Sequence, residues 1–343
     1  MEFQEKLLFN NNFETKSNVD EAVHQLLLHQ LENWELAKKN YTGLNSILER
    51  SFKYDGFEIK VQFNPERIRS SAAKVDQKSI SERKCFLCSA HLPIEQKGLL
   101  YNNRFLILVN PFPIFSRHLT IPALQHRPQQ IESDFISMLD LAESLNDYAI
   151  FYNGPKCGAS APDHFHFQAG NKGFLPIESE FKRIQSNKTN HTLKSKNGQI
   201  CFINDYLRKL ITIESADKVY ISETFNSIYN TLKGFFPQED EPLLNILAYK
   251  ENEKFIIQIF PRQKHRPDQF YAEGEKQLLI SPASVDFGGV FITPRKEDFD
   301  KITANDITDI FNQVSLDTNR FAELEQNMQS LKDFNNYNKK SII

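Results

Sequence analysis

The hydrophobic pattern along the first half of the chain alternates between two periods. Four apolar residues from Phe57 to Phe63 alternate with polar ones, which is the two-residue period of a half-buried strand. Apolar side chains recur every three or four positions over residues 18–50 and 128–147, and this spacing predicts helices. Further strands are expected over residues 104–109, 118–121, 149–153 and 163–169. The pattern therefore predicts an α+β fold with an antiparallel sheet.

The second half of the chain repeats this order of elements in a weaker form. Residues 244–249 and 255–260 have the pattern of a hairpin, followed by the proline-bounded basic segment 261–267. Residues 278–281 and 290–293 then flank a glycine-bearing loop. We interpret the repeat as an internal duplication, so that the chain has two similar halves with antiparallel sheets and the second half is degenerate.

Polar segments set the expected domain boundaries. Residues 65–84 and 171–200 are polar and basic, and the end of the chain is rich in asparagine and lysine. The predicted organisation is a helical segment (1–56), a catalytic half (57–170), a linker or excursion (171–200), the degenerate second half (201–325) and a frayed tail (326–343).

The strongest chemical signal is the run His164-Phe165-His166-Phe167-Gln168, which follows a loop of small residues. On a strand, the histidines and the glutamine share one face, roughly 6.5–7 Å apart, and the phenylalanines occupy the other. Both imidazoles can then serve one small site, with His166 as a nucleophile or general base. Gln168 does not titrate, so we expect it to donate a hydrogen bond to a phosphate or to the reacting group.

Several other residues near strand ends are candidate substrate contacts. Gly158 and Ser160 lie in the small-residue loop, which can offer backbone N–H groups and a hydroxyl to an anion. Asn153 ends the preceding predicted strand, and Arg67 and Lys264 belong to basic clusters beside strand ends. Such clusters are more often solvated surface than ligand contacts.

A close pair of cysteines, Cys85 and Cys88, predicts a metal site. The C-x₂-C spacing holds zinc through two thiolates and needs two further ligands, for which we expect His126 and His164. His91 and His118 are the alternatives. A redox pair would need a thioredoxin-like context that the sequence lacks, and two incidental buried cysteines are the remaining interpretation.

Composition narrows the class of protein. The chain has 343 residues and a net charge of −3, which argues against a protein that coats nucleic acid. It has no apolar run long enough to span a bilayer, and its amino terminus lacks the features of a signal peptide. Its four cysteines are too few for a disulfide scaffold, so we expect reduced thiols and a cytoplasmic location; Cys157 and Cys201 receive no role.

The motif resembles the transferase branch of the histidine-triad superfamily. This branch includes galactose-1-phosphate uridylyltransferase, diadenosine tetraphosphate phosphorylase and GDP-hexose phosphorylase, and the wording His-Phe-His-Phe-Gln-Ala is most similar to the last. The segments Asn110-Pro111-Phe112-Pro113 and His118–His126 also match, and Cys85 and Cys88 resemble the zinc knuckle of the uridylyltransferases. Asp163 and Phe165 replace prolines of the uridylyltransferase motif.

The resemblance implies a nucleotidyltransferase or phosphorylase. His166 would attack the α-phosphorus of a nucleoside diphosphate sugar or dinucleoside polyphosphate, and phosphate or a sugar phosphate would take up the nucleotide. His164 would bind zinc or orient His166, and Ser160 with Gly158 would hold phosphate oxygens. Gln168 stands where hydrolytic members carry a third histidine, which favours transfer over hydrolysis.

Two other functions fit the same pattern. A nucleotide-sugar or dinucleotide hydrolase would need no phosphate acceptor, and a non-catalytic nucleotide-binding module would keep the fold without turnover. The sequence implies no nucleic acid and no membrane as partners, and it leaves a homodimer open.

Overall fold

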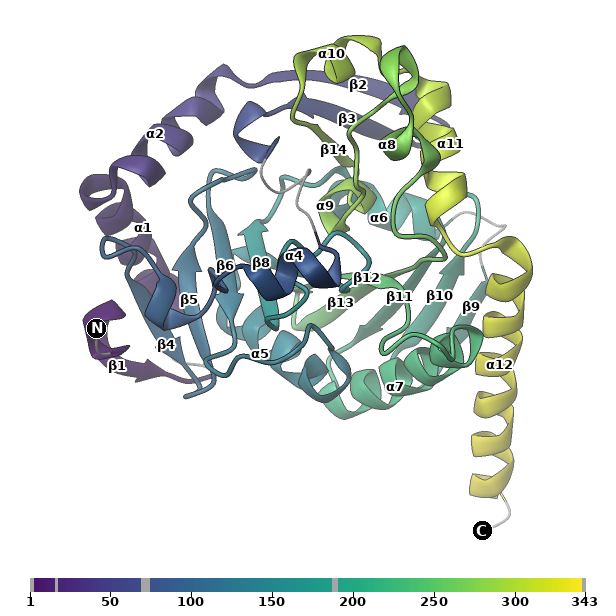
Figure 1. Ribbon diagram of the computed structural model, residues 1–343. Coiled ribbons are helices and arrows are strands. Elements are labelled where there is room, and N and C mark those ends of the chain that lie inside the picture. Colours follow the sequence, from purple (N-terminus) through teal and green to yellow (C-terminus); the bar gives the residue numbers. More distant parts are fainter. Residues whose placement is uncertain (1–2, 16–17, 69–74, 187–190, 341–343) are drawn as a thin grey trace.

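A single large sheet forms the centre of the molecule (Figure 1). The computed structural model describes residues 3–15, 18–68, 75–186 and 191–340. Within these residues the sheet has eleven strands, in the order β1 (Leu7–Phe13), β4 (Gly98–Tyr101), β5 (Phe105–Val109), β6 (His118–Pro122), β8 (His166–Asn171), β7 (Tyr148–Asn153), β12 (Leu244–Glu251), β13 (Lys254–Pro261), β11 (Leu210–Ser215), β10 (Gln199–Ile203) and β9 (His191–Lys194). Neighbouring strands are antiparallel except β1 and β4, so the predicted antiparallel α+β fold is confirmed.

A second, smaller sheet lies at the top of the molecule in Figure 1. It contains β2 (Leu48–Tyr54), β3 (Phe57–Phe63) and β14 (Val290–Thr293), with β3 in the middle. The strand predicted over 57–63 is therefore present, and it pairs in parallel with β14 from the far end of the chain. Residues 278–281, expected as a strand, do not form one: the N–H of Ile280 donates to the carbonyl of Leu278 within the segment.

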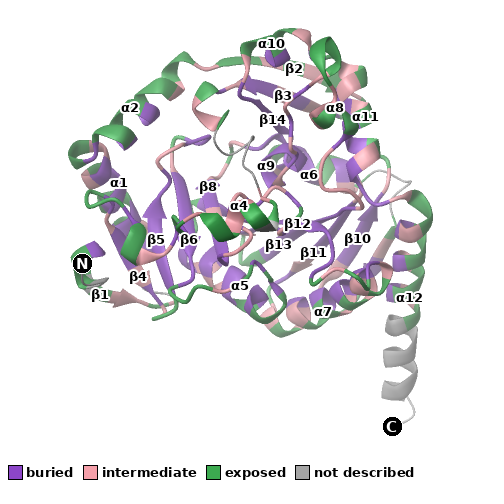
Figure 2. Ribbon diagram, viewed as in Figure 1, coloured by how far each residue is buried: buried purple, intermediate pink, exposed green. Residues whose placement is uncertain are grey.

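Helices cover the two faces of the large sheet differently. One face packs against α1 (Val19–Asn33), α2 (Glu35–Gly43), α5 (Phe135–Ser144), α7 (Lys218–Phe235) and α12 (Thr318–Lys340). On the other face, the small sheet, α6 (Pro176–Gln185), α9 (Ser284–Phe287), α10 (Lys296–Lys301) and α11 (Ala304–Val314) cover the second half. Apart from the edge strands β1 and β9, the strands of the large sheet are almost entirely buried (Figure 2). Two short helices, α4 (Gln77–Glu82) and α8 (Asp268–Tyr271), lie in connecting segments.

The strand order has an internal two-fold symmetry. Counted inward from one edge of the sheet, the strands follow in the order β4-β5-β6-β8-β7. Counted inward from the opposite edge, the corresponding strands are β9-β10-β11-β13-β12, and the two halves meet where β7 pairs with β12. Gln168 lies opposite Thr120 and Phe151, just as Gln258 lies opposite Thr212 and Leu247.

The register also shows what the second half has lost. Two positions before Gln258, the place that corresponds to His166 is taken by Ile256. The second half is therefore degenerate, as predicted. It begins with β9, earlier than the strand patterns indicated.

Three local predictions need correction. The helix expected over 18–50 is broken at Trp34, whose extended backbone separates α1 from α2, and residues 48–50 already belong to β2. Residues 171–200 contain α6 and β9 and are not a bare linker, because α6 buries Ile177, Phe181 and Ile184. The tail from residue 326 continues α12 to Lys340. No helix in the described ranges is long and apolar enough to cross a bilayer.

Candidate active site

The histidine motif lies where β8 begins. Phe165 and Phe167 belong to the main core, and His166 and Gln168 face the opposite side of the sheet, as the alternation predicted. The strand starts only at His166, however, so His164 lies in the turn before it rather than on the strand. Its N–H donates to the carbonyl of Ala161, which closes that turn.

Among the described residues, only one ring nitrogen of His166 has a hydrogen-bond partner. Its Nδ1 lies 2.8 Å from the carbonyl oxygen of His164, so Nδ1 carries the ring proton and donates a hydrogen bond to that oxygen. Nε2 is then the nitrogen with the available lone pair. The residue is 4% exposed, and burial lowers the pKa of His166 to about 4.

Gln129 separates the two strands at this point. Continued by two residues beyond Phe151 and Gln168, the β7–β8 register would pair Asn153 with His166. Instead the amide of Gln129 lies between them: its Oε1 accepts from the N–H of His166 at 2.8 Å. Its Nε2 lies 3.0 Å from the carbonyl oxygens of both Asn153 and His166. This fully buried amide replaces a peptide unit of the ladder and was not identified from the sequence.

A second histidine orients Gln168. The backbone N–H of Ile114 donates to His118 Nδ1 at 3.2 Å, so Nε2 of His118 carries a proton and donates to Gln168 Oε1 at 3.0 Å. The pKa of His118 is lowered to about 3 by burial and by nearby Arg67, which keeps this ring neutral. The Nε2 amide group of Gln168 has no partner among the described residues and is left to donate to a ligand.

The four predicted metal ligands form one cluster. Ligand atoms of Cys85, Cys88, His126 and His164 all lie within 4.8 Å of one another. His164 Nδ1 is 3.2 Å from Cys85 Sγ and 3.5 Å from Cys88 Sγ, and His126 Nδ1 is 3.3 Å from Cys88 Sγ. Two thiols and two imidazoles in this arrangement can hold a metal ion.

The alternative metal ligands lie outside this cluster. His91 Nδ1 is 2.8 Å from the carbonyl oxygen of Cys85, and His118 supports Gln168. His164 also joins the cluster to the catalytic strand: its Nε2 is 2.8 Å from the carbonyl oxygen of Ala123, and its own carbonyl accepts from His166. A metal ion in this cluster would therefore be linked to the imidazole of His166 through a single residue, His164.

Two cavities meet beside the motif, sharing Arg67, Ser160 and Gln168 in their walls. The large cavity has a volume of about 440 Å³ and also contains His166. Most of its remaining lining is apolar: Trp34, Leu36, Phe86, Leu87, Leu92, Pro93, Leu108, Pro111 and Phe112, with the polar residues Gln96, Asn110 and Thr120.

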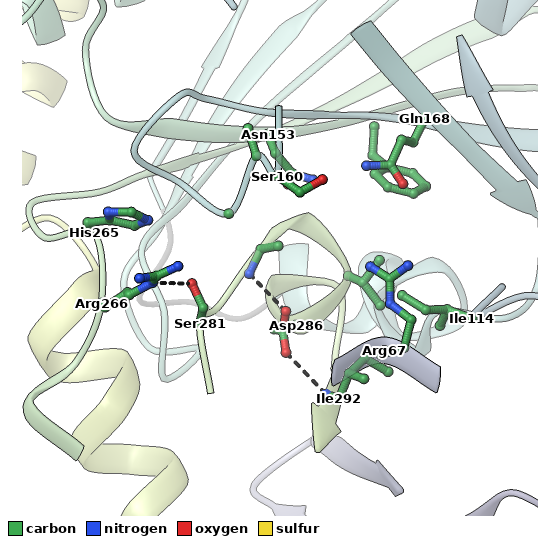
Figure 3. Close-up of a pocket in the computed structure, with 15 residues that line it drawn as sticks. Arg67, Ile114, Asn153, Ser160, Gln168, His265, Arg266, Ser281, Asp286 and Ile292 are labelled. Atoms are coloured by element: carbon green, nitrogen blue, oxygen red, sulfur yellow. Dashed lines mark hydrogen bonds between the residues drawn. The ribbon is translucent and has the colours of Figure 1, made fainter. Parts of the chain in front are cut away.

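The small cavity is polar and has a volume of about 50 Å³ (Figure 3). Its cations are Arg67 and Arg266, and the second half supplies His265, Ser281 and Asp286. Burial raises the pKa of Asp286 to about 7, although the N–H groups of Ala283 and Ile292 bond to its carboxyl.

Lys264, expected to contact substrate, lies elsewhere. Its ammonium group pairs with Asp268, and it lines neither of the two cavities. The adjacent His265 and Arg266 line the small cavity instead. The sequence contained a signal for them, because they belong to the same basic segment after the second hairpin.

Asn153 is held so that its amide nitrogen is free. Its Oδ1 accepts from Asn245 Nδ2 at 2.9 Å and from the backbone N–H of Ser284 at 2.8 Å. Asn153 lines the small cavity, and its Nδ2 has no partner in the described part of the chain. Like Gln168, it presents an amide donor to a ligand.

The small-residue loop packs against the second half. Gly158 has a φ of +93°, and a Cβ there would lie 2.5 Å from the Cβ of Ala283, so both conformation and space require glycine. This turn places Ser160 between the two cavities.

The comparisons with known proteins agree with this architecture. Solved structures of yeast Ap4A phosphorylase Apa2 superimpose with a TM-score of 0.57 for the complex with AMP and 0.56 for the complex with Ap4A. Each is 17% identical and covers 88% of this chain, and 97% and 98% of the respective yeast chains. The chain has the fold of yeast Ap4A phosphorylase.

Two family models match separate parts of the chain. Residues 26–171 match a domain of unknown function, DUF4922, and residues 180–334 match the GDPGP1-like C-terminal domain. Among curated proteins none matches. The C-terminal model and the fold confirm the predicted resemblance to the transferase branch of the histidine-triad superfamily. They also agree with the predicted class of enzyme, a nucleotidyltransferase of the phosphorylase type.

Proposed function

We propose that this protein is a nucleotidyltransferase of the phosphorylase type. It would transfer a nucleoside monophosphate from a nucleoside diphosphate sugar or a dinucleoside polyphosphate to phosphate or a sugar phosphate. The observation that carries the proposal is the position of His166: its ring, with Nε2 unprotonated, lines the apolar cavity, which shares Arg67, Ser160 and Gln168 with the cationic one.

The two cavities suit the two parts of such a substrate. The large cavity, apolar and about 440 Å³, has the size and lining to take a nucleoside. The small cavity has two arginines and the amide donors of Asn153 and Gln168, which suit phosphate oxygens. The yeast phosphorylase of the same fold was solved with AMP and with Ap4A, which supports this class of ligand.

The reaction would proceed in two displacements. Nε2 of His166 attacks the α-phosphorus, a P–N bond forms, and the P–O bond to the leaving group breaks with its electron pair on oxygen. The positive charge that develops on the imidazole is stabilised by the hydrogen bond from Nδ1 to the carbonyl of His164. An oxygen of the acceptor then attacks the same phosphorus, the P–N bond breaks, and His166 returns to its starting form.

We propose that the cluster of cysteines and histidines holds a structural zinc ion. Sulfur and nitrogen ligands of a tetrahedral zinc ion lie about 3.5 Å apart, as its bond lengths require. The observed separations of 3.2, 3.3 and 3.5 Å fit this value. Cys85, Cys88, His126 and His164 would hold the ion, which supplies rigidity at the start of the motif.

All four described thiols are free, in keeping with a reducing compartment such as the cytoplasm.

Hydrolysis on the same scaffold is the second candidate. Gln168 argues against it, because an amide cannot remove a proton from water. Turnover that is independent of added phosphate would favour the hydrolase. Ligand binding without turnover of any nucleotide sugar or dinucleotide would favour a binding module.

Trapping the covalent intermediate tests the proposal. The full chain is incubated with nucleotide sugars and dinucleotides labelled at the α-phosphate, without acceptor, and then denatured. We expect a labelled protein, and phosphate or a sugar phosphate added before denaturation should discharge the label. His166→Ala should abolish labelling, and His24→Ala, an exposed histidine on α1, should not change it. Equal labelling of the His166→Ala variant would disprove the assignment.

A further inference from the structure

A fully buried cation, Arg262, directly follows the end of β13. Arg262 has no exposed surface, and its N–H groups all meet neutral oxygens. These are Oδ1 of Asn245 and the carbonyls of Pro282, Lys264, His265 and Val314, at 2.8–3.3 Å. Within the described residues no carboxylate forms an ion pair with it.

An unpaired buried charge is costly, because neutral dipoles replace water incompletely. The carboxyl group of Asp286 is close enough to affect Arg262 electrostatically, but its hydrogen bonds come from the backbone N–H groups of Ala283 and Ile292 instead. Such an arrangement is tolerated where a bound anion supplies the missing counter-charge. The question is whether Arg262 is connected to a place where an anion binds.

Two asparagines connect it to the small cavity. Nη1 of Arg262 donates to Asn245 Oδ1 at 2.8 Å, and Nδ2 of Asn245 donates to Asn153 Oδ1 at 2.9 Å. Asn153 lines the small cavity with its free amide nitrogen. Each hydrogen bond polarises the next in the same direction, away from the guanidinium and toward the cavity.

We propose that Arg262 is a positioning residue for the phosphate site: its fixed charge, directed through Asn245 and Asn153, strengthens the binding of an anionic phosphate in the small cavity. This relay, the hydrogen-bonded series Arg262–Asn245–Asn153, runs from the end of β13 through β12 of the second half to β7 of the first half. The degenerate half therefore retains a function, to supply the positive charge under a site whose nucleophile belongs to the other half. The inference rests on the proposed function only in taking the cavity to bind phosphate.

A purely structural role makes a different prediction. Arg262 also holds the backbone of residues 264 and 265 and of Pro282, so any substitution disturbs the cavity wall. Lysine and glutamine at this position both lose most of these contacts, and lysine alone keeps the charge. The comparison of the two variants therefore separates charge from contacts.

The experiment measures the affinity of the full chain for inorganic phosphate by titration calorimetry. We expect Arg262→Gln to weaken binding at least tenfold and Arg262→Lys to stay within threefold of the unchanged chain. Arg117→Gln, at an exposed ion pair with Asp147, is the matched control and should have no effect. Equal losses in the glutamine and lysine variants, or no loss in either, would overturn the proposal.

A second variant covers the case in which Arg262→Gln does not fold. Asn245→Leu keeps the volume and interrupts the relay while Arg262 remains, and it should also weaken phosphate binding at least tenfold. Unchanged affinity in this variant would overturn the relay. Because binding is measured without turnover, a chain that binds phosphate but forms no covalent intermediate would refute the proposed function alone. Absence of phosphate binding by the protein without substitutions would refute the inference.

Discussion

The side-chain amide of Gln129 hydrogen-bonds to both backbone polar groups of His166, accepting from its N–H at 2.8 Å and donating to its carbonyl at 3.0 Å. The same amide donates to the carbonyl of Asn153. One side chain therefore sets the distance between the strand that bears the nucleophile and the strand that bears an amide donor of the small cavity.

Replacing Gln129 should slow the chemical step more than it weakens substrate binding. Gln129→Met keeps the volume and leaves buried backbone groups of His166 and Asn153 without partners, at a cost of about 1–3 kcal/mol each. A displacement of the imidazole by ~1 Å is enough for a loss of about 100-fold in kcat. We expect a loss of this order with KM changed less than fivefold, measured by steady-state kinetics.

The control for this variant is Gln258→Met. Gln258 is equally buried in the second half, and neither of its side-chain polar atoms has a hydrogen-bond partner within the described ranges. Its replacement should leave kcat unchanged and raise the thermal midpoint, because an unsatisfied amide is removed from the core. Wild-type kcat in Gln129→Met would show that the amide has no role in positioning.

The orientation of Gln168 predicts an order of severity among its variants. His118 donates to its Oε1, so the Nε2 group is the one available to phosphate. Gln168→Ala removes this donor, and Gln168→Glu also places a carboxylate next to the phosphate. We expect kcat/KM to fall about tenfold for alanine and at least 100-fold for glutamate. A glutamate variant no worse than alanine would contradict the assigned orientation.

Removal of the metal should inactivate the enzyme through His164. Elemental analysis of the purified chain should find one zinc ion, which Cys85→Ser loses together with most activity and several degrees of thermal midpoint. The reason is that the ion would fix His164, whose carbonyl holds the imidazole of His166. Cys201→Ser, a buried thiol outside the cluster, should retain the metal. Purified protein that contains no metal would contradict the proposed zinc site.

A buried carboxyl group predicts how stability changes with pH. Burial raises the pKa of Glu241 from 4.5 to about 8, even though the OH of Tyr152 and the N–H of Ile131 bond to it. Between about pH 4.5 and 8 the folded state keeps a proton that the unfolded state has lost, so the contribution of Glu241 to the free energy of unfolding falls as pH rises. Buried His118 and His166, whose pKa values are lowered, act in the opposite direction below about pH 6.5. The largest slope for one proton is about 1.4 kcal/mol per pH unit.

Glu241→Gln should flatten this dependence, measured by urea unfolding at pH 5, 6, 7 and 8. Glutamine can accept from the N–H of Ile131 as the protonated acid does, so stability at pH 5 should change little and stability at pH 8 should rise. The pH dependence that remains should come from Asp286, whose pKa burial raises to about 7, and from the buried histidines, which act in the opposite direction. The test is therefore the difference between the variant and the unchanged chain at each pH. An unchanged slope would mean that Glu241 keeps an ordinary pKa.

The choice between His118 and His126 illustrates what sequence spacing leaves open. Both follow the cysteine pair at workable distances, and the predicted cluster with His126 agrees with the structure. The pairing of β6 with β8 decides the matter, because it puts His118 opposite Gly170, beside Gln168, and leaves His126 beyond the end of the strand. Sheet register of this kind depends on contacts between residues about 50 positions apart.

The small cavity shows the same limit. The sequence drew attention to the basic segment after the second hairpin, yet Lys264 points to Asp268 while Arg266 faces the cavity. Which member of a basic run faces a ligand depends on the path of a loop, and no periodicity defines that path. Gln129 carried no signal at all, since a lone glutamine in a helical pattern is ordinary.

By itself the sequence determined the local and chemical parts of this protein: the antiparallel strands, the repeated order of elements, the phenylalanines of the core and the residue types suited to metal binding and nucleophilic attack. These follow from the two-residue period of strands and from side-chain chemistry, which neighbouring residues define. Tertiary structure alone decided that β8 starts at His166, that Gln129 separates it from β7, and that the second half provides Arg262 and Arg266. These features depend on pairing between strands far apart in the chain, where burial and hydrogen bonding, rather than local pattern, select the partners.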